Sequence, residues 1–270
     1  MKKVYNPKEY WQNHLEGNLS LSGVGFTQFG KSYNKCLYKM RKRVFERAIL
    51  KYEIDVLDTK ILDIGCGSGF YVDILKQKGA KHLTGIDITA ISVIELSAKY
   101  PTFNFYEADI TSPTLIHELP LKPGDFDLIT AFDVLFHIVD DFEFIQAIKN
   151  VKMLCSKDGL IFITDIFPHK RPYIVFHQKS RVLKEYIQLL ADNEIEIIDR
   201  MPVHYLLSAP LDISNGLLQK ILLRIYWDRI IRVIERKTHL LGPIFLGIDS
   251  ILTRLFKESP STEMIICRPA

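Results

Sequence analysis

Between residues 60 and 200 the chain alternates short apolar runs with longer stretches in which apolar positions recur every three or four residues. The short runs are typical of strands buried on both faces of a parallel sheet, and the longer period is typical of helices. The predicted strands are 60–65, 82–87, 103–109, 126–132, 159–166, 194–203 and, at the end, 262–268. The predicted helices between them are 69–78, 89–100, 140–155 and 177–192. The alternation predicts an α/β fold with a doubly wound, mostly parallel sheet.

The chain on either side of this alternation is predicted to be helical. Residues 34–52 place apolar side chains at helical spacing, after a glycine-punctuated loop at 21–32. Residues 217–236 have a broad apolar face, and Pro243 predicts a break in the next helix, 239–256. Three parts follow: a helical lid or substrate segment at 1–58, an α/β domain at 59–203 plus 258–270, and a helical insertion at 204–257 that caps the sheet.

Composition narrows the class of protein. The 270 residues are 47% hydrophobic and 25% charged, an ordinary globular mix. The four cysteines form no C-x-x-C pair, which argues against a disulfide scaffold or a cysteine zinc site. The first residues lack the apolar run of a signal peptide, and no stretch reaches about 18 uninterrupted apolar residues. We therefore expect a reduced, cytoplasmic protein.

Charge is small overall, at +3, but uneven along the chain. Residues 31–51 carry a net charge of +7 and residues 217–257 a net charge of +5. Such segments can attract an anionic substrate, an acidic membrane surface or nucleic acid, or can form solvated helix faces. For 217–236, packing on the sheet, a homodimer interface and peripheral membrane contact all remain open.

The strongest chemical signal is the segment ILDIGCGSGF at 61–70, a buried strand that enters a glycine-rich turn and then a helix. Glycines are needed where the backbone turns sharply or where a ligand approaches it closely. Ser68 is predicted to cap the helix, whose N-terminus offers free N–H groups to an anionic ligand group. Asp87 and Asp109 close the next two strands, so all three features meet at the carboxyl edge of the sheet.

Taken together, these residues resemble the class I S-adenosylmethionine-dependent methyltransferases. LDIGCGSG is similar to the first motif of that family, and GID, EADI, FDLITAFDVLFHI and LCSKDGLIFITD resemble its later motifs in order. The resemblance covers about 60–200 and the last strand. It implies a seven-stranded Rossmann-like sheet of order 3-2-1-4-5-7-6 with the seventh strand antiparallel. It also implies S-adenosyl-L-methionine as cofactor and S-adenosyl-L-homocysteine as product.

The resemblance also implies roles for individual residues. Asp87 would bind the ribose hydroxyls, and Asp109 the adenine amino group with the backbone of Ile110. Asp133 would lie beside the sulfonium. The implied cofactor-binding residues are Asp63, Gly65, Cys66, Gly67, Gly69, Asp87, Ile88, Asp109, Ile110 and Phe132.

Candidates for catalysis follow from the chemistry of the acceptor. A hydroxyl acceptor needs a base, for which histidine is suited near neutral pH. The candidates are His137, Asp133 and Asp165, although the histidine of a comparable segment is structural in many relatives. The substrate candidates are Tyr33, Arg41, His169, His177 and Tyr205, with Arg41 able to grip a carboxylate or phosphate. No metal is expected, because position 136 is Phe where metal-using relatives have an acidic ligand.

These features predict methyl transfer to an O or N atom of a small-molecule or lipid-linked acceptor. An anionic group on that acceptor would suit the basic segments. A non-catalytic cofactor-binding regulator is the alternative. A nicotinamide-dependent oxidoreductase is disfavoured because the G-x-G-x-x-G spacing is absent. A nucleic-acid target is disfavoured because the [DNS]-P-P-[YFW] motif is absent.

Overall fold

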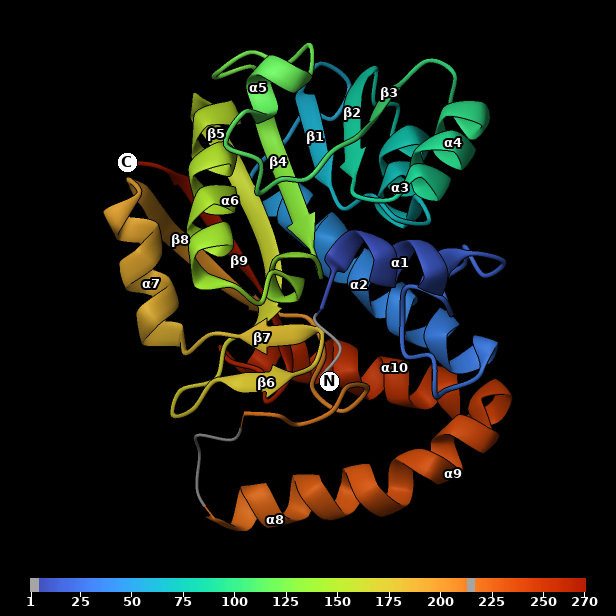
Figure 1. The fold of residues 1–270 in the computed structure, drawn as a ribbon. Coiled ribbons are helices and arrows are strands. Elements are labelled where there is room, and N and C mark those ends of the chain that lie inside the picture. The colour runs from blue at the N-terminus through green and yellow to red at the C-terminus, as the bar shows by residue number, and fades with distance from the viewer. Residues whose placement is uncertain (1–4, 213–216) are drawn as a thin grey trace.

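The computed structural model describes residues 5–212 and 217–270, and its centre is a seven-stranded sheet (Figure 1). The strands are β1 (Lys60–Ile64), β2 (His82–Asp87), β3 (Asn104–Glu107), β4 (Phe126–Phe132), β5 (Cys155–Ile166), β8 (Ile195–Pro202) and β9 (Thr262–Pro269). Their order is β3-β2-β1-β4-β5-β9-β8, and β9 runs antiparallel to both β5 and β8. The predicted fold class and strand order are confirmed.

Each face of the sheet is covered by helices. Neighbouring residues of a strand point to opposite faces, so Ile61 and Leu62 enter two different apolar clusters. One cluster is closed by α2 (Lys31–Lys51), α3 (Phe70–Gln77) and α4 (Ala90–Lys99). The other is closed by α5 (Leu115–Glu118), α6 (Asp141–Leu154) and α7 (Leu183–Asp192). Burial on both faces explains why the strands are almost continuously apolar.

Short elements gather at the carboxyl edge of the sheet, below the strands in Figure 1. They are α1 (Pro7–Leu15), the 3-10 helix η1 (Leu135–His137), and the hairpin of β6 (Tyr173–Val175) and β7 (Gln178–Ser180). The predicted helix 177–192 was wrong in its first six residues, because α7 begins only at Leu183. Ser180 ends β7 instead and donates to buried Asp165 at 3.0 Å, which ties the hairpin to β5.

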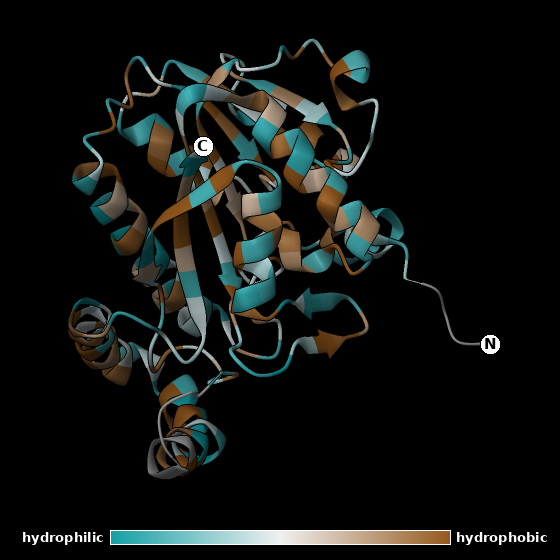
Figure 2. Ribbon diagram, turned by 90° about the vertical axis from the view of Figure 1, so that its left-hand side faces the viewer, coloured by the Kyte–Doolittle hydropathy of each residue, from teal (hydrophilic) through white to brown (hydrophobic). Residues whose placement is uncertain are grey.

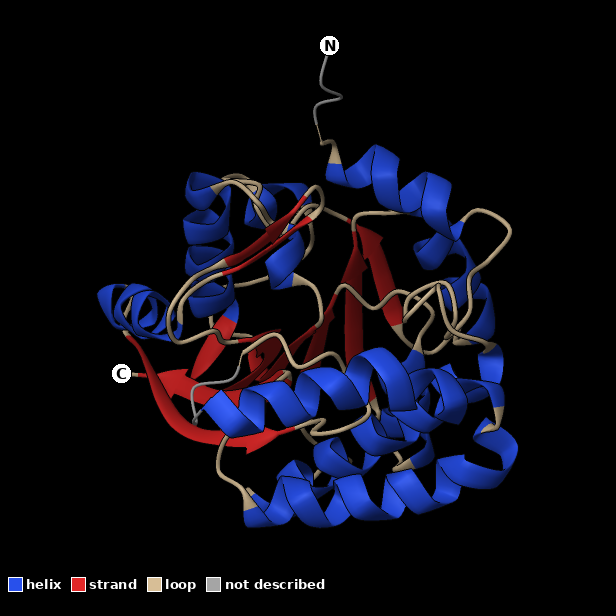
Figure 3. Ribbon diagram, turned by 90° about the horizontal axis from the view of Figure 1, so that it is seen from below, coloured by secondary structure: helices blue, strands red, loops and turns tan. Residues whose placement is uncertain are grey.

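The outermost layer is the helical insertion, which we call the cap (residues 204–212 and 217–257). It contains α8 (Leu217–Ile225), a π-helical turn η2 (Tyr226–Ile230), α9 (Ile231–Arg236) and α10 (Thr238–Leu255). Figure 3 shows these helices as the layer nearest the viewer when the molecule is seen from below. The predicted break at Pro243 was wrong, because Pro243 lies inside α10, and its exposed ring removes only one backbone donor.

Among the described residues, no helix is both long enough and apolar enough to cross a bilayer.

Candidate functional site

A cavity of about 620 Å³ lies at the carboxyl edge of the sheet. It is lined by the glycine turn after β1, by the ends of β2, β3 and β4, by α1 and α2, by the β6–β7 hairpin and by the cap. The strand ends of a parallel sheet are the usual place for a ligand, because the chain diverges there to either face.

The glycine turn after β1 lines one side of the cavity. Gly65, Gly67 and Gly69 have φ values of 68°, 49° and 78°, in the left-handed region that favours glycine. A Cβ on Gly65 would lie 2.7 Å from Val134, so the turn also needs glycine for space. The predicted cap at Ser68 was wrong: Gly69 is the N-cap of α3, and Ser68 lines the cavity.

Asp87, at the end of β2, holds the glycine turn in place. The backbone N–H of Gly67 donates to its Oδ2 at 2.8 Å. The N–H and hydroxyl of Thr89 donate to its Oδ1 at 2.9 and 2.6 Å. Burial raises the pKa of Asp87, whose side chain lines the cavity. The Asp87 carboxylate therefore has two roles: it orders the glycine turn, and it presents a hydrogen-bond acceptor to the cavity.

The end of β3 adds a second acid to the same wall. Asp109 accepts from the N–H and the hydroxyl of Thr111, both on its Oδ1, at 2.9 and 2.8 Å. The next residue, Ile110, is fixed because Asn150 of α6 donates to its carbonyl at 2.6 Å. Both Asp109 and Ile110 line the cavity.

Asp133 follows β4 and faces a residue from the N-terminal segment. Its φ of 56° is unusual for a residue other than glycine. Its N–H donates to the hydroxyl of Thr164 at 2.9 Å, and its carboxylate forms an ion pair with Arg41 of α2. Arg41 lies over the ring of Tyr38, 5.2 Å from its centroid. The Arg41 guanidinium is thus already paired within the cavity.

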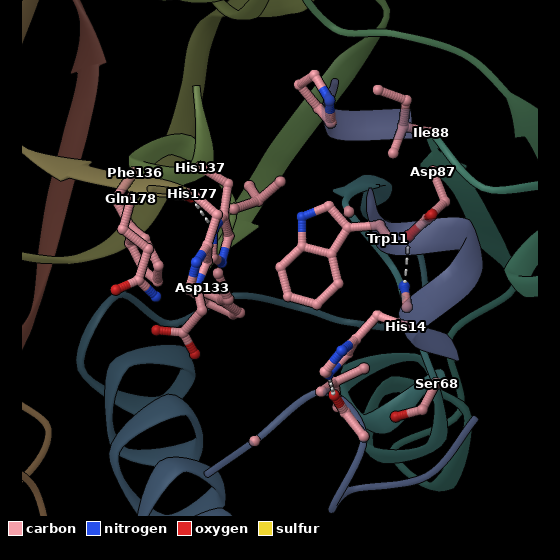
Figure 4. Close-up of a pocket in the computed structure, with 18 of the residues that line it drawn as sticks. Trp11, His14, Ser68, Asp87, Ile88, Asp133, Phe136, His137, His177 and Gln178 are labelled. Atoms are coloured by element: carbon pink, nitrogen blue, oxygen red, sulfur yellow. Dashed lines mark hydrogen bonds between the residues drawn. The ribbon is translucent and has the colours of Figure 1, made fainter. Parts of the chain in front are cut away.

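Imidazoles and an indole line the opposite side (Figure 4). His137 and His177 stack with ring centroids 5.6 Å apart, and Trp11 meets His137 edge-on at 4.6 Å. Burial lowers the pKa of His137 to about 3, so its ring is neutral at physiological pH. Its Nδ1 is bonded to the carbonyl of His177 at 2.8 Å and must therefore carry the proton, which leaves Nε2 as an acceptor.

The indole of Trp11 stands between this group and Asp87, as Figure 4 shows. His14, one turn further along α1, is bonded through Nε2 to the carbonyl of Gly23 at 3.0 Å. Tyr10 stacks on His177 with centroids 5.0 Å apart. The helix α1 is therefore a wall of the cavity, joined to the loop at 21–32 and to the hairpin.

Most of the residues singled out from the sequence meet at this cavity. Those that line it are Gly65, Cys66, Gly67, Asp87, Ile88, Asp109, Ile110, Phe132, Asp133, His137, Arg41 and His177. Those outside its lining are Asp63, Gly69, Asp165, Tyr33, His169 and Tyr205.

The residues outside the lining have other partners. Buried Asp63 accepts from Thr130 at 2.6 Å, and burial raises its pKa to about 7. Tyr33 donates to the carbonyl of Leu207 at 2.8 Å. His169 is bonded to Asp212 at 2.5 Å, and Tyr205 stacks on Phe256.

Sequence reasoning did not place Trp11, His14, Ser68 or Gln178 in the site, although all four line the cavity. For Trp11 and His14 the signal was the aromatic density of the first residues, which fits plain packing equally well; Ser68 belongs to the glycine-rich turn, and Gln178 gave no signal of its own. Among the described residues, no group of three His, Cys, Asp or Glu side chains is placed to hold a metal ion.

Comparisons with known proteins agree with this geometry. Residues 61–159 match the family described as a methyltransferase domain. A ubiquinone biosynthesis O-methyltransferase of Albidiferax ferrireducens is 26% identical over 185 residues, covering 64% of this chain and 68% of that protein. For most of the curated relatives it matches, the chain spans only about half of their length.

Solved structures show the same fold. A [4+2]-cyclase, SpnF, superposes with a TM-score of 0.53 at 16% identity, covering 84% of this chain and 81% of that one. Magnesium protoporphyrin IX methyltransferase of Synechocystis, with bound SAM, has a TM-score of 0.53 at 19% identity and covers 74% of this chain and 91% of that one. The sheet and its glycine turn define a Rossmann-like, class I fold. Over residues 61–159 the chain is similar to the methyltransferase domain family, and its fold is that of S-adenosylmethionine-dependent methyltransferases.

Proposed function

We propose that this protein transfers a methyl group from S-adenosylmethionine to an oxygen or nitrogen atom of a small-molecule or lipid-linked acceptor. One observation carries the proposal. A single cavity is lined both by the glycine turn with Asp87 and by an aromatic and imidazole wall around His137. Such an arrangement has room for a nucleoside on one side and an acceptor on the other.

The residues on the glycine side fit S-adenosylmethionine. Gly65 and Gly67 border the cavity without side chains, so a ligand can approach the backbone. The carboxylates of Asp87 and Asp109 can accept hydrogen bonds from ribose hydroxyls and an adenine amino group. When bound, S-adenosylmethionine supplies a methyl group on a positively charged sulfur, to be attacked in line by the acceptor.

On the acceptor side the chain orients its ligand and excludes water. Trp11, Phe132 and Phe136 supply apolar surface in the cavity wall. The lone pair on Nε2 of His137 can accept a hydrogen bond from an acceptor hydroxyl. A pKa of about 3 makes this imidazole a weak base, so we assign His137 as a positioning residue. The O-methyltransferase among the relatives supports an oxygen acceptor. The predicted cytoplasmic location stays a prediction.

The first test is titration calorimetry of the full chain with S-adenosylhomocysteine and, separately, with NAD. We expect the homocysteine compound to bind and NAD not to bind. Asp87→Asn should weaken binding about 100-fold, because hydrogen bonds to a charged acceptor are lost. Asp158→Asn is the matched control, since exposed Asp158 lies near the amino end of β5, away from the cavity. An absence of binding, or equal binding by Asp87→Asn, would overturn the proposal.

The second test measures release of S-adenosylhomocysteine from S-adenosylmethionine in the presence of phenolic, amine and tRNA acceptors. Turnover with a phenol or amine supports the proposed reaction. Cofactor binding without turnover on any of these would favour the regulatory alternative. Turnover with tRNA alone would show that the acceptor is a nucleic acid and not a small molecule.

A further inference from the structure

Exposed apolar side chains are concentrated on the cap. Of the 20 large apolar side chains that are exposed in the described part of the chain, 11 lie between residues 221 and 256. They are Ile221, Leu222, Ile225, Ile230, Val233, Leu240, Ile244, Ile248, Ile251, Leu255 and Phe256. We call this set the cap surface. A concentration of exposed apolar side chains of this kind usually marks a contact with another body.

The helix α10 shows the pattern most clearly, because it carries a row of apolar side chains on its outward face as well as apolar side chains in the core. Its inward face carries Thr238, Gly242, Leu246, Asp249 and Thr253, all buried. Its outward face carries a row of apolar residues spaced by four, four, three and four positions: Leu240, Ile244, Ile248, Ile251 and Leu255. These side chains are between 39% and 72% exposed. A surface helix normally places its apolar row inward, and no described residue covers this outward row, so the row is suited to contact with another body.

The inward face of α10 is bonded to α2 and to the backbone of residues 205–206. The Nη1 atom of Arg43 in α2 donates to the carbonyl of Leu246 at 3.4 Å and to the hydroxyl of Ser250 at 3.0 Å. Asp249 accepts from the backbone N–H groups of Tyr205 and Leu206 at 3.0 and 2.5 Å. The inward face is thus fixed against the protein, and the helix cannot rotate its outward apolar row inward without breaking these bonds.

Positive charge surrounds the cap surface. Seven basic residues between 221 and 257 are exposed: Arg224, Arg229, Arg232, Arg236, Lys237, Arg254 and Lys257. None forms an ion pair with an acid in the described ranges. Asp228 is the one exposed acid between 221 and 257. Figure 3 shows α8, α9 and α10 together at the outer side of the molecule, and in Figure 2 the helices at the lower edge carry both hydrophilic and hydrophobic turns.

We propose that the cap surface docks on an anionic membrane, with its apolar side chains at the level of the lipid headgroups and its arginines at the phosphates. Apolar residues mixed with arginine and lysine give this kind of interfacial binding, and long basic side chains reach the phosphates while their stems stay apolar. The positive charge of the cap surface favours an anionic membrane over a second copy of the chain as the partner. A two-fold dimer packs the same surface against itself, which would gather the seven cations of each copy in one interface with only one exposed acid from each.

The location of the cap surface also bears on the acceptor. Trp227, in the turn between α8 and α9, lines the cavity, as does Leu211 of the cap. The cap therefore connects the docking surface to the acceptor side of the site. Resting on the proposed function, this indicates an acceptor carried on an apolar chain that enters from the bilayer.

Vesicle flotation tests the docking directly, using phosphatidylcholine vesicles with and without phosphatidylglycerol. We expect the full chain to float only with the anionic vesicles and to be partly released at high salt. The triple variant Ile244→Glu, Ile248→Glu and Ile251→Glu should lose binding. Its matched control, Leu50→Glu, Ile94→Glu and Phe142→Glu, introduces the same charges at exposed apolar positions outside the cap and should still bind.

A second variant tests the charge. Arg229→Gln, Arg232→Gln and Arg236→Gln together should lower the partition coefficient on anionic vesicles by about 100-fold, since each basic residue near such a surface contributes about 1 kcal/mol. Each variant is also tested for binding of S-adenosylhomocysteine, which shows that the variant is folded. This measurement keeps the test of membrane docking separate from the test of methyl transfer.

Three results would overturn the proposal. The first is a folded chain that does not float with anionic vesicles. The second is equal flotation by the wild type and the glutamate triple variant of α10. The third is a dimer, seen by light scattering without lipid, that this same variant dissociates; the cap surface would then be a homodimer interface.

Discussion

At the scale of single residues, Asp133 links the end of β4 to Arg41 of α2, and both residues line the cavity. Its left-handed backbone costs free energy of about 1–3 kcal/mol in a residue with a side chain, so neighbouring contacts must hold it. Thr164 supplies one such contact, and Arg41 supplies another from α2. The pair therefore connects the N-terminal segment to the end of β4, next to the glycine turn.

We expect this ion pair to be energetically coupled. In a double-mutant cycle of Arg41→Gln and Asp133→Asn, the coupling free energy should be about 1–2 kcal/mol, because the charges are largely withdrawn from water. Their side chains are only 11% and 21% exposed. Urea unfolding of the four proteins measures it. The pair of Lys60 and Asp125, exposed by 55% and 34%, is the control and should couple by at most about 0.5 kcal/mol. Additive effects at Arg41 and Asp133 would contradict the expectation.

Asp165 should make stability depend on pH. Burial raises its pKa from 3.8 to about 7 in the folded protein, so the folded state holds the proton more tightly than the unfolded state. Its contribution to stability is complete below the unfolded pKa and is lost as pH rises through the folded pKa. Asp165→Asn should therefore reduce the loss of unfolding free energy between pH 5 and pH 8 by about 2 kcal/mol. Urea unfolding at both pH values checks this, and an unchanged difference would contradict it.

At the scale of elements, α10 shows that a proline need not end a helix. Pro243 is the sixth residue of α10 and is exposed, so its ring displaces no packed neighbour. Its cost is the missing N–H that would otherwise donate to the carbonyl four residues earlier. The contacts of the inward face with α2 keep the helix continuous despite that loss.

Pro243→Ala should accordingly stabilise the protein. Alanine restores the backbone donor and has a high helix propensity, so the free energy of unfolding should rise by about 1–3 kcal/mol. Thermal and urea unfolding both report it. Pro101→Ala is the control, since Pro101 lies in an exposed turn after α4, where loss of the ring should destabilise by about 0.5–1 kcal/mol. A lower stability of Pro243→Ala would mean that its ring contributes to the fold.

At the scale of the whole molecule, the cavity wall is assembled from parts far apart in the chain. Trp11 of α1, His177 of the hairpin and Trp227 of the cap all line a cavity whose other side is the glycine turn. Occupation of this cavity by a ligand should therefore stabilise the entire fold, since the ligand binds only the assembled state.

S-adenosylhomocysteine at a concentration of 100 times its dissociation constant should add about 2.7 kcal/mol to the stability of the folded state. For a chain of this size, the midpoint of thermal unfolding should rise by about 5 °C. Differential scanning calorimetry measures the shift. Adenosine alone should give a smaller shift, and an unchanged midpoint would contradict ligand binding in the cavity.

Much of the fold could be predicted from the sequence, because its signals are local. The apolar runs identified the seven strands, and the resemblance supplied their order. Gly65, Gly67, Asp87 and Asp109 could be assigned to one site because the carboxyl ends of parallel strands meet at one edge. The hairpin before α7 was missed, since two three-residue strands leave no periodic pattern.

Other features were decided only by the tertiary structure. Nothing local to Arg41 indicates that it pairs with Asp133, and nothing local to Asp165 shows that it turns away from the cavity to hold Ser180. The position of Trp11 between Asp87 and His137 depends on how α1 lies across the strand ends. The sequence by itself determined the sheet, its glycine turn and its strand-end acids, because each follows from neighbouring residues. Packing between distant segments decided which side chains face the ligand and left the apolar row of α10 facing outward.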